Sequence, residues 1–396
     1  MTTNNDRHIL VAHPSAEMYG SDRVLLEDVK GLLQAGWTVT VALPAEGLLA
    51  DALRPLGAEV VICPTPVLRK SIFKPHGAAM FLKDAVRGFK HSRQLLSRVK
   101  PAAVLVNTTT IPLWLALPRL FGRRIVLHVH ESERRASTLL RVGLSLPSSL
   151  AHKVITNSHF TNDSYLKFVP WVRSRSQVIL NGVPGPEETT PPRAQLDGPV
   201  RLLYVGRLSE RKGVMVAVEA VELLQRKGLD VELSLVGAVY EGYEWFEEKL
   251  REAVARLPRP DRVEFLGFQD PVWPHYAATD IALVPSTLEE PFGNTAVEAV
   301  LAERPVIASR IGGLREAAEP YNSGVLVSPG DAEDLARGIE RIIENWQDYR
   351  KDATAAVEIA RQRHDPQHFG AQIERVVSAA AGIDTSHLKS ATQRTE

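Results

Sequence analysis

Residues 281–313 have the sequence IALVPSTLEEPFGNTAVEAVLAERPVIASRIGG. An apolar run, 281–284, is followed by a turn that Pro291 and Gly293 mark, a helical stretch from about Asn294, and a second apolar run, 306–309. Both runs are nearly continuous in aliphatic residues, which is typical of parallel strands buried on both faces. The order strand, helix, strand predicts one unit of a doubly wound α/β sheet.

Similar apolar runs recur along the whole chain in two series. The first comprises residues 8–13, 38–43, 59–63, 102–107, 124–130, 153–157 and 177–180, and the second 200–205, 231–236, 263–266, 281–284, 306–309 and 325–327. Amphipathic stretches such as 22–34 and 78–99 separate them. The pattern predicts an α/β fold of two doubly wound, Rossmann-like domains, with a ligand cleft at the facing carboxyl ends of their strands.

A proline-rich stretch separates the two series. Prolines this dense exclude a helix and a central strand, so residues 186–199 are predicted to be a linker. It would join an N-terminal domain over 1–185 to a C-terminal domain over 200–367. A helix is predicted over 368–381, and the polar residues 382–396 are expected to form a disordered tail.

The formal net charge of zero conceals an asymmetry. Residues 1–185 hold 23 Lys and Arg against 12 Asp and Glu, and residues 186–396 hold 24 against 35, giving +11 and −11. The basic half favours an anionic partner surface, and no nucleic-acid partner is expected. One cysteine, Cys63, excludes an intrachain disulfide. No apolar run approaches the roughly 20 residues of a membrane span, so we expect a cytoplasmic protein, soluble or peripheral.

Three motifs of nucleotide chemistry are absent from the sequence. There is no Gly-x-Gly of a dinucleotide fingerprint, no Gly-Lys-Ser/Thr of a P-loop, and no Asp-x-Asp that would clamp magnesium. Oxidoreductase and kinase-like functions are therefore disfavoured. We expect neither a cofactor nor a metal.

The stretch quoted above also holds a candidate ligand site. Glu290 precedes the expected helix and Glu298 lies one turn into it, so both carboxylates could accept hydrogen bonds from vicinal hydroxyls of one ligand. The backbone N–H groups of Phe292, Gly293 and Asn294 at the helix start could bind an anion or sugar oxygens. The alternative is that Glu298 is a solvated helix residue and Glu290 a loop carboxylate.

A second candidate, residues 204–213 (YVGRLSERKG), directly follows the first strand of the second series. A loop turns at Gly206, and a helix is expected after Gly213. Arg207 and Lys212 would lie at a strand's carboxyl end, where they could hold a pyrophosphate that gains charge as it leaves. The alternative is that both are ordinary exposed cations.

Together these stretches resemble the family 4 retaining glycosyltransferases of the GT-B fold, also called group 1 glycosyltransferases. The resemblance covers residues 8 to about 380 and is strongest over 200–330. It rests on the Glu-x7-Glu pair and on two parts of the 204–213 stretch, Gly206–Arg207 and Lys212–Gly213. The other matching residues are 181–183, 265–267, 280, 285–286 and 312–313.

The resemblance implies roles for single residues. Glu290 would meet the donor sugar, Glu298 the ribose, and Arg207 with Lys212 the pyrophosphate. His130 stands where the family has a His that reaches the donor sugar, although His128 points to the same side of the strand. The final helix would return to the first domain.

Two departures from the family pattern lie outside these motifs. The family has paired glycines in the first-domain loop where this chain has residues 18–22 (MYGSD), so Gly20 alone could let the backbone approach phosphate or acceptor. Residues 302–305 (AERP) lack the glycine that usually precedes the proline, for which we expect only a structural consequence.

The implied reaction is transfer of a sugar, expected to be a hexose, from a UDP- or GDP-linked donor to an acceptor hydroxyl with retention of configuration. Two other functions remain open: a nucleotide-sugar epimerase on the same fold, and a non-catalytic nucleotide-sugar binding protein. The residues leave the base, the sugar, the acceptor and the linkage undecided.

Residues 69–100 form a basic, amphipathic stretch. They hold nine Lys and Arg and one acid, Asp84, with interleaved Phe73, Met80, Phe81, Val86 and Phe89. This pattern is typical of a helix in a membrane interface. Together with the family, it predicts binding to an anionic membrane and a lipid-linked or glycan acceptor in surface polysaccharide assembly. The alternative is that the apolar residues face the domain core.

Overall fold

The computed structural model describes residues 7–68, 75–131 and 145–383, with backbone only for 75–82 and 84. Internal contacts divide the chain into two compact units. Unit 1 comprises Met1–Gly182 and Pro366–Glu396, and unit 2 comprises Val183–Asp365. The chain therefore leaves unit 1 after Gly182 and returns to it at Pro366.

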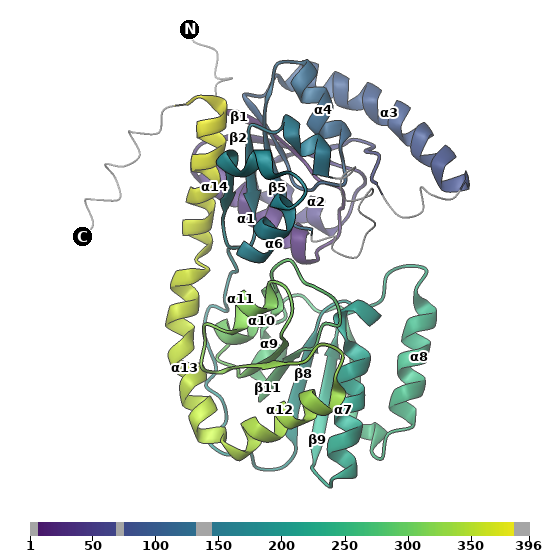
Figure 1. The fold of residues 1–396 in the computed structure, drawn as a ribbon, viewed down its shortest axis with the longest axis vertical. Helices are drawn as coiled ribbons and strands as arrows, with labels where there is room; N and C mark the ends of the chain where they lie inside the picture. Colours follow the sequence, from purple (N-terminus) through teal and green to yellow (C-terminus); the bar gives the residue numbers. More distant parts are fainter. Residues whose placement is uncertain (1–6, 69–74, 132–144, 384–396) are drawn as a thin grey trace, which may run out of the picture. The chain divides into compact units, whose positions relative to one another are not determined.

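Unit 1 is a parallel seven-stranded sheet in the order β3-β2-β1-β4-β5-β6-β7. Figure 1 shows strands of this sheet, among them β1, β2 and β5, with helices packed around them. The strands of unit 1 are β1 (His8–Ala12), β2 (Thr38–Leu43), β3 (Glu59–Ile62), β4 (Ala103–Val106), β5 (Arg124–Val129), β6 (Lys153–Thr156) and β7 (Ser176–Val178). Its helices are α1 (Gly20–Gln34), α2 (Leu48–Leu53), α3 (Pro75–Val99), α4 (Leu113–Leu120), α6 (His159–Leu166) and α14 (Pro366–Ala381).

Both faces of this sheet are buried, which explains the continuous apolar runs. Along β1, Ile9 and Val11 enter the cluster formed with α1, α2 and α14. Leu10 and Ala12 enter the cluster on the other face, formed with α3, α4 and α6. Successive side chains of a strand point to opposite faces, so a strand covered on both sides has no polar alternation.

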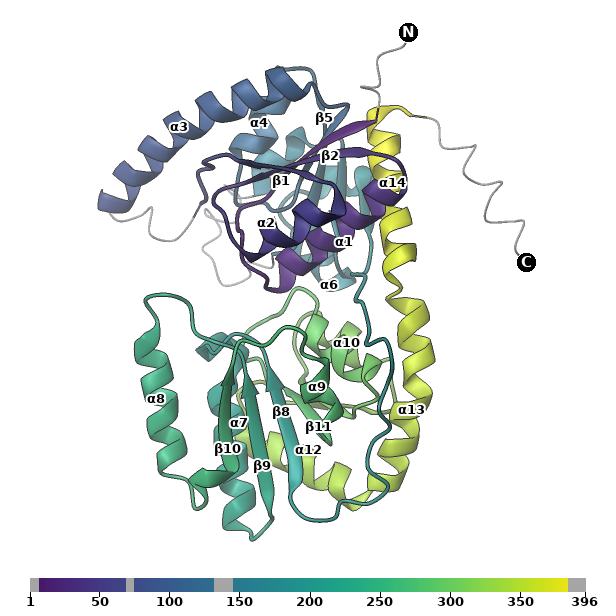
Figure 2. The same cartoon turned by 180° about the vertical axis from the view of Figure 1, so that it is seen from behind.

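The last helix, α14, packs directly against α1 (Figure 2). The two helices touch at glycines: a Cβ on Gly31 would lie 2.4 Å from the Cα of Gly370. Phe369 and Ile373 from α14 are buried in the core of unit 1. The Trp37 indole N–H donates to Glu374 of α14, 337 residues later in the sequence, at 3.3 Å. Thus α14 is an integral part of the N-terminal unit.

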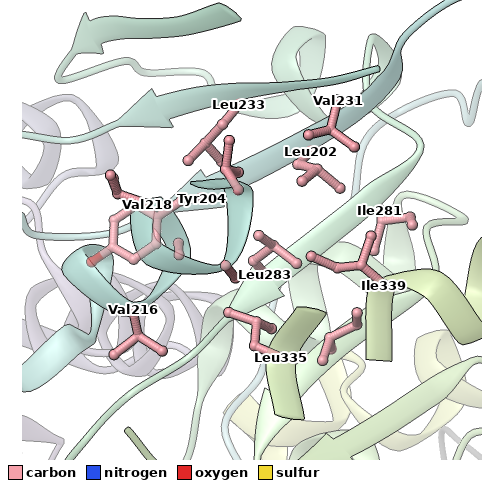
Figure 3. Close-up of a cluster of buried hydrophobic side chains, with 14 of the residues drawn as sticks. Leu202, Tyr204, Val216, Val218, Val231, Leu233, Ile281, Leu283, Leu335 and Ile339 are labelled. Atoms are coloured by element: carbon pink, nitrogen blue, oxygen red, sulfur yellow. The ribbon is translucent and has the colours of Figure 1, made fainter. Parts of the chain in front are cut away.

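Unit 2 is a parallel six-stranded sheet in the order β10-β9-β8-β11-β12-β13. Its strands are β8 (Val200–Val205), β9 (Val231–Val236), β10 (Val263–Gly267), β11 (Ile281–Val284), β12 (Val306–Ser309) and β13 (Gly324–Val327). Its helices are α7 (Val214–Arg226), α8 (Glu244–Ala255), α9 (Trp273–Ala277), α10 (Asn294–Leu301), α11 (Leu314–Ala318), α12 (Ala332–Glu344) and α13 (Trp346–Arg363). Figure 3 shows the apolar core that joins these strands to the surrounding helices.

The proline-rich segment over residues 186–199 forms no helix or strand and packs onto unit 2. Arg193 forms an ion pair with the buried Asp280, which also pairs with Arg201 at 2.9 Å. The Trp346 indole donates to the backbone carbonyl of Arg193 at 3.0 Å. Burial would raise the pKa of Asp280, but hydrogen bonds from the two guanidinium groups outweigh it and the pKa is lowered.

Residues 302–305, which lack the glycine of the family pattern, have a local structural explanation. Glu303 takes the left-handed backbone conformation, with φ of 59°, which favours glycine. Its carboxylate accepts hydrogen bonds from Thr189 at 2.5 Å and Thr354 at 3.4 Å. Arg304 is buried, and its guanidinium donates to carbonyls including those of Tyr276 at 2.8 Å and Ala277 at 2.9 Å.

The predicted α/β class with two doubly wound sheets is confirmed. The predicted tail over residues 382–396 lies outside the described residues from 384 onward. Within the part of the chain that the structure describes, each helix is too short or too polar to cross a bilayer.

Candidate functional site

Two loops of unit 2 meet because the strands before them are neighbours. β8 and β11 pair in parallel, so their carboxyl ends lie at the same edge of the sheet. The loop after β8 holds Lys212 and the loop after β11 holds Glu290. The Lys212 ammonium donates to Glu290 Oε2 at 2.9 Å. The two sequence motifs therefore form one site.

Gly213 makes this meeting possible. Its φ is +72°, and a Cβ there would lie 1.8 Å from the carbonyl oxygen of Pro285 at the end of β11. Next to it, Thr287 N–H donates to the Arg211 carbonyl at 2.9 Å. A side chain at position 213 would push the two loops apart, since the clash is with backbone.

Glu290 is a buried carboxylate with three cationic or hydroxyl neighbours. It is 5% exposed. Besides Lys212, Ser286 Oγ donates to it at 3.1 Å, and the Arg211 guanidinium lies 3.9 Å away. Burial alone would raise its pKa, but the charges of Lys212 and Arg211 and the two hydrogen bonds outweigh burial and lower the pKa. Glu290 is therefore a fixed negative charge at neutral pH.

The Gly312–Gly313 pair supports the backbone of the Glu290 loop. Gly313 N–H donates to the Glu290 carbonyl at 2.8 Å. A Cβ on Gly312 would lie 2.6 Å from that carbonyl oxygen, and one on Gly313 would lie 2.3 Å from the Pro291 carbonyl oxygen. Only glycines allow the loop after β12 to approach so closely.

Helix α10 begins at Asn294, as the sequence predicts, directly after Gly293 with φ of +121°. Phe292 before it is buried against His364. Glu298 is 8% exposed, and its Oε2 accepts from the Tyr276 hydroxyl at 3.4 Å. The interpretation of Glu298 as a solvated residue is therefore wrong, whereas Glu290 does lie in a loop, as a buried carboxylate.

Arg207 also follows β8. Its guanidinium lies 3.2 Å from the ring centroid of Tyr240, a cation–π contact that holds the side chain against the loop after β9. That loop approaches closely, since a Cβ on Gly237 would lie 1.9 Å from the Gly206 carbonyl oxygen. The stacking on Tyr240 thus helps to position the Arg207 guanidinium at this end of β8.

The two remaining predicted residues, His130 and Gly20, belong to unit 1. His130 follows β5, is 9% exposed, and its Nε2 lies 2.8 Å from Asn107 Oδ1. Burial, with lesser contributions from His128 and His13, lowers the pKa of His130 well below its ordinary value. Gly20 is the first residue of α1, and a Cβ there would meet no atom within 4 Å.

Sequence reasoning missed several side chains of the site. Arg211 precedes the predicted Lys212 and could have been included on charge alone. Ser286 lies in the family stretch 285–286, four residues before Glu290, but its contact with that carboxylate was not predicted. Tyr276 on α9 and Tyr240 after β9 have no local signal, because tertiary packing brings them to Glu298 and to Arg207. Among the described residues, His, Cys, Asp and Glu side chains nowhere gather in threes in a way that could hold a metal ion.

Two family models match this chain. Residues 18–184 match "Glycosyltransferase Family 4", and residues 187–363 match "Glycosyl transferases group 1". The chain belongs to the group 1, family 4 glycosyltransferases. The predicted family is thereby confirmed, and its two models divide close to the observed boundary after Gly182.

Curated relatives of this family 4 chain match only part of its length. It is 31% identical over 232 residues to a glycogen synthase of Mycobacterium tuberculosis, covering 57% of this chain and 54% of the relative. It is 36% identical over 153 residues to a 2-deoxystreptamine glucosyltransferase of Streptomyces kanamyceticus, covering 38% of each. The chain thus matches about half, or less, of the length of these relatives.

Solved structures match over nearly the whole chain. HepE from Anabaena, in complex with UDP-glucose, has a TM-score of 0.77 and 25% identity, covering 94% of this chain and 99% of HepE. The lipopolysaccharide outer core galactosyltransferase WaaB has a TM-score of 0.68 and 16% identity, covering 94% of this chain and 99% of WaaB. These likenesses confirm the predicted GT-B fold.

Proposed function

We propose that this protein is a retaining, metal-independent glycosyltransferase that moves a hexose from a UDP- or GDP-linked donor to an acceptor hydroxyl. The observation on which the proposal chiefly rests is the buried, ionised Glu290 held 2.9 Å from Lys212 at the carboxyl ends of adjacent strands. A buried carboxylate that stays ionised is costly to keep, so one paired with the half-buried Lys212 at this edge of the sheet favours a functional site.

The division of roles follows from charge. Lys212 has three N–H donors, of which Glu290 uses one, so the ammonium can also donate to a phosphate oxygen. Arg207, fixed by Tyr240, offers a planar fork suited to a diphosphate. Glu290 and Glu298 only accept, and we assign them to sugar and ribose hydroxyls, with the backbone of Phe292, Gly293 and Asn294 beside the sugar.

The reaction we propose breaks the bond between the anomeric carbon and the diphosphate oxygen. Charge develops on the leaving diphosphate, where Lys212 and Arg207 stabilise it. That oxygen takes the proton of the acceptor hydroxyl, which attacks on the same face and so retains the configuration. Ionised Glu290 stabilises the oxocarbenium-like sugar. We assign His130, uncharged because its pKa is lowered, to a sugar hydroxyl, and Gly20 to close backbone approach.

The first donor to test is UDP-glucose, because HepE is solved with it. A thermal-shift panel of UDP, GDP, ADP and their sugars ranks the nucleotides, since a ligand that binds only the folded state raises the melting temperature. Incubation with labelled nucleotide sugars, with and without a membrane lipid extract, then tests the reaction. A transferase consumes donor only with acceptor, an epimerase changes the donor alone, and a binding protein does neither.

We further propose a lipid-linked acceptor in surface glycan assembly, reached at the cytoplasmic face of a membrane. The supporting observation is α3, where Lys83, Arg87 and Lys90 are exposed beside Val86 and Phe89, which are 67% and 44% exposed. The alternative that all apolar residues of this stretch face the core is wrong for these two. Residues 69–74 lie outside the described residues.

Co-sedimentation with anionic and neutral vesicles at low and high salt tests this membrane proposal. We expect salt-sensitive binding to anionic vesicles, since each basic residue near such a surface contributes about 1 kcal/mol. Changing Lys83, Arg87 and Lys90 to Glu should abolish it. The matched control changes Lys249, Arg251 and Arg256 at α8 to Glu, and it should leave vesicle binding intact. Binding that survives the α3 reversal would contradict the proposal.

A further inference from the structure

The carboxyl ends of three adjacent strands in unit 1 hold polar side chains that form one hydrogen-bonded chain. His13 follows β1, Asn107 follows β4, and His130 follows β5. Asp22 in the first turn of α1 completes the chain. The distances are 2.6 Å from Asp22 Oδ1 to His13 Nε2, 3.1 Å from His13 Nδ1 to Asn107 Nδ2, and 2.8 Å from Asn107 Oδ1 to His130 Nε2.

All four side chains are buried, with exposures between 1% and 9%. A buried polar group needs a partner, so each link of this chain determines the next. The Asp22 carboxylate can only accept, and His13 Nε2–H therefore donates to it. The amide nitrogen of Asn107 faces His13 Nδ1, which must accept, because a neutral imidazole has one donor and one acceptor.

The same reasoning determines which ring nitrogen of His130 carries the proton. With its amide nitrogen committed to His13, Asn107 presents its carbonyl oxygen, and His130 must donate to it through Nε2–H. The His130 ring is uncharged at neutral pH because burial lowers its pKa. Its proton is thus on Nε2, and Nδ1 is the acceptor of the ring.

Both ends of this hydrogen-bonded series of side chains are held in place. The second oxygen of Asp22 accepts the Tyr19 N–H at 3.0 Å at the start of α1. The His130 ring packs against His128 with 4.0 Å between centroids, and His128 Nδ1 pairs with the buried Asp28 at 3.2 Å. Neither Asp22 nor the His130 ring can turn without breaking a buried contact.

We propose that Asp22 acts through His13 and Asn107 to hold His130 in the Nε2–H tautomer, so that Nδ1 accepts a hydrogen bond from a hydroxyl of the donor sugar. Asp22, His13 and Asn107 are positioning residues in this account. The inference rests on the proposed function for the role of the sugar, but the tautomer itself is independent of it.

Asp22→Asn tests the chain with little change of shape. The carbonyl oxygen of the new asparagine would accept from the Tyr19 N–H, so its amide nitrogen would face His13 Nε2 and donate to it. Each later link then reverses, and the His130 proton moves to Nδ1. A second variant, Asn107→Leu, breaks the chain whichever way residue 22 turns. The exposed carboxylate of α2, changed by Asp51→Asn, is the control.

Nitrogen-15 NMR of histidine-labelled, full-length protein reads the tautomer, with His130→Gln used to assign the signals. We expect Nε2–H in the wild type and in the control, Nδ1–H in Asp22→Asn, and loss of the Nε2–H preference in Asn107→Leu. Retention of Nε2–H in Asp22→Asn overturns the role of Asp22, and retention in both variants overturns the whole proposal.

A double-mutant cycle tests the link to turnover. Asp22→Asn should lower kcat about tenfold to hundredfold, by analogy with the loss of a group that orients a metal-bound His. It should add almost nothing in the His130→Gln background, because both changes remove the same interaction. Equal losses in both backgrounds would show a general structural effect and contradict the proposal. If no nucleotide sugar is turned over by the wild type, the proposed function fails while the tautomer result still stands.

Discussion

At the scale of single residues, the account depends on why Glu290 is ionised while buried. Burial disfavours a carboxylate, and a lone one would become neutral. Lys212, Arg211 and Ser286 reverse this and lower its pKa. The result is an ionised carboxylate 2.9 Å from the Lys212 Nζ, which suits a reaction that separates a cationic sugar from an anionic diphosphate.

Glu290→Gln keeps the shape of the side chain and removes its charge. We expect kcat to fall about hundredfold or more, the usual cost of losing one electrostatic contact to a transition state. Affinity for the nucleoside diphosphate should stay nearly constant, because we assign Glu290 to the sugar rather than to the phosphates. Kinetics and calorimetry measure the two effects, with the exposed Glu319→Gln as control. Wild-type turnover in Glu290→Gln would remove Glu290 from the mechanism.

Lys212→Ala and Arg207→Ala should act on the phosphates. Each should weaken binding of the nucleoside diphosphate by about 1.5–3 kcal/mol, the range for hydrogen bonds to charged groups. The nucleoside alone should bind these variants and the wild type alike in calorimetry. Arg226→Ala removes an exposed cation at the far end of α7. It should change neither the affinity for the nucleoside nor that for the nucleoside diphosphate. An equal loss for nucleoside and diphosphate would mean that the two residues shape the site generally.

At the scale of elements, the site depends on the adjacency of β8 and β11 and on the glycines that let their loops meet. The strands over 200–205 and 281–284 and the helix starts at Val214 and Asn294 could be predicted, because apolar runs, prolines and glycines act locally. The 2.9 Å contact between Lys212 and Glu290 could not, since residues 78 positions apart meet only through strand order.

Gly213→Ala tests this packing directly. The added Cβ would meet the Pro285 carbonyl at 1.8 Å, so the Lys212 loop must move away from Glu290. We expect weaker nucleoside diphosphate binding and a clear loss of turnover. Gly228→Ala is a matched control, because Gly228 also has a left-handed φ, +86°, but a Cβ there meets nothing within 4 Å. The same loss of activity in both variants would assign the effect to backbone strain alone.

At the scale of the whole molecule, the sequence suffices for the fold class and the family because every strand is a separate apolar run. Much of unit 1's polar chain was not predicted: His13, Asn107 and Asp22 lie on different elements, and only the order β1-β4-β5 joins them. The contacts of Arg193 in the 186–199 segment, an ion pair with Asp280 and a hydrogen bond from Trp346, likewise depend on tertiary packing. Local patterns specify elements, and the sheet order then decides which polar residues meet.

The most direct test of the central claim is the configuration of the product. The purified chain, the donor that ranks first in the panel and an accepted hydroxyl compound are followed by proton NMR from the first turnover, with and without EDTA. The account predicts that the new glycosidic bond has the donor's anomeric configuration and that EDTA changes neither rate nor product. An inverted product would contradict same-face attack and the mechanism built on Glu290, Lys212 and Arg207.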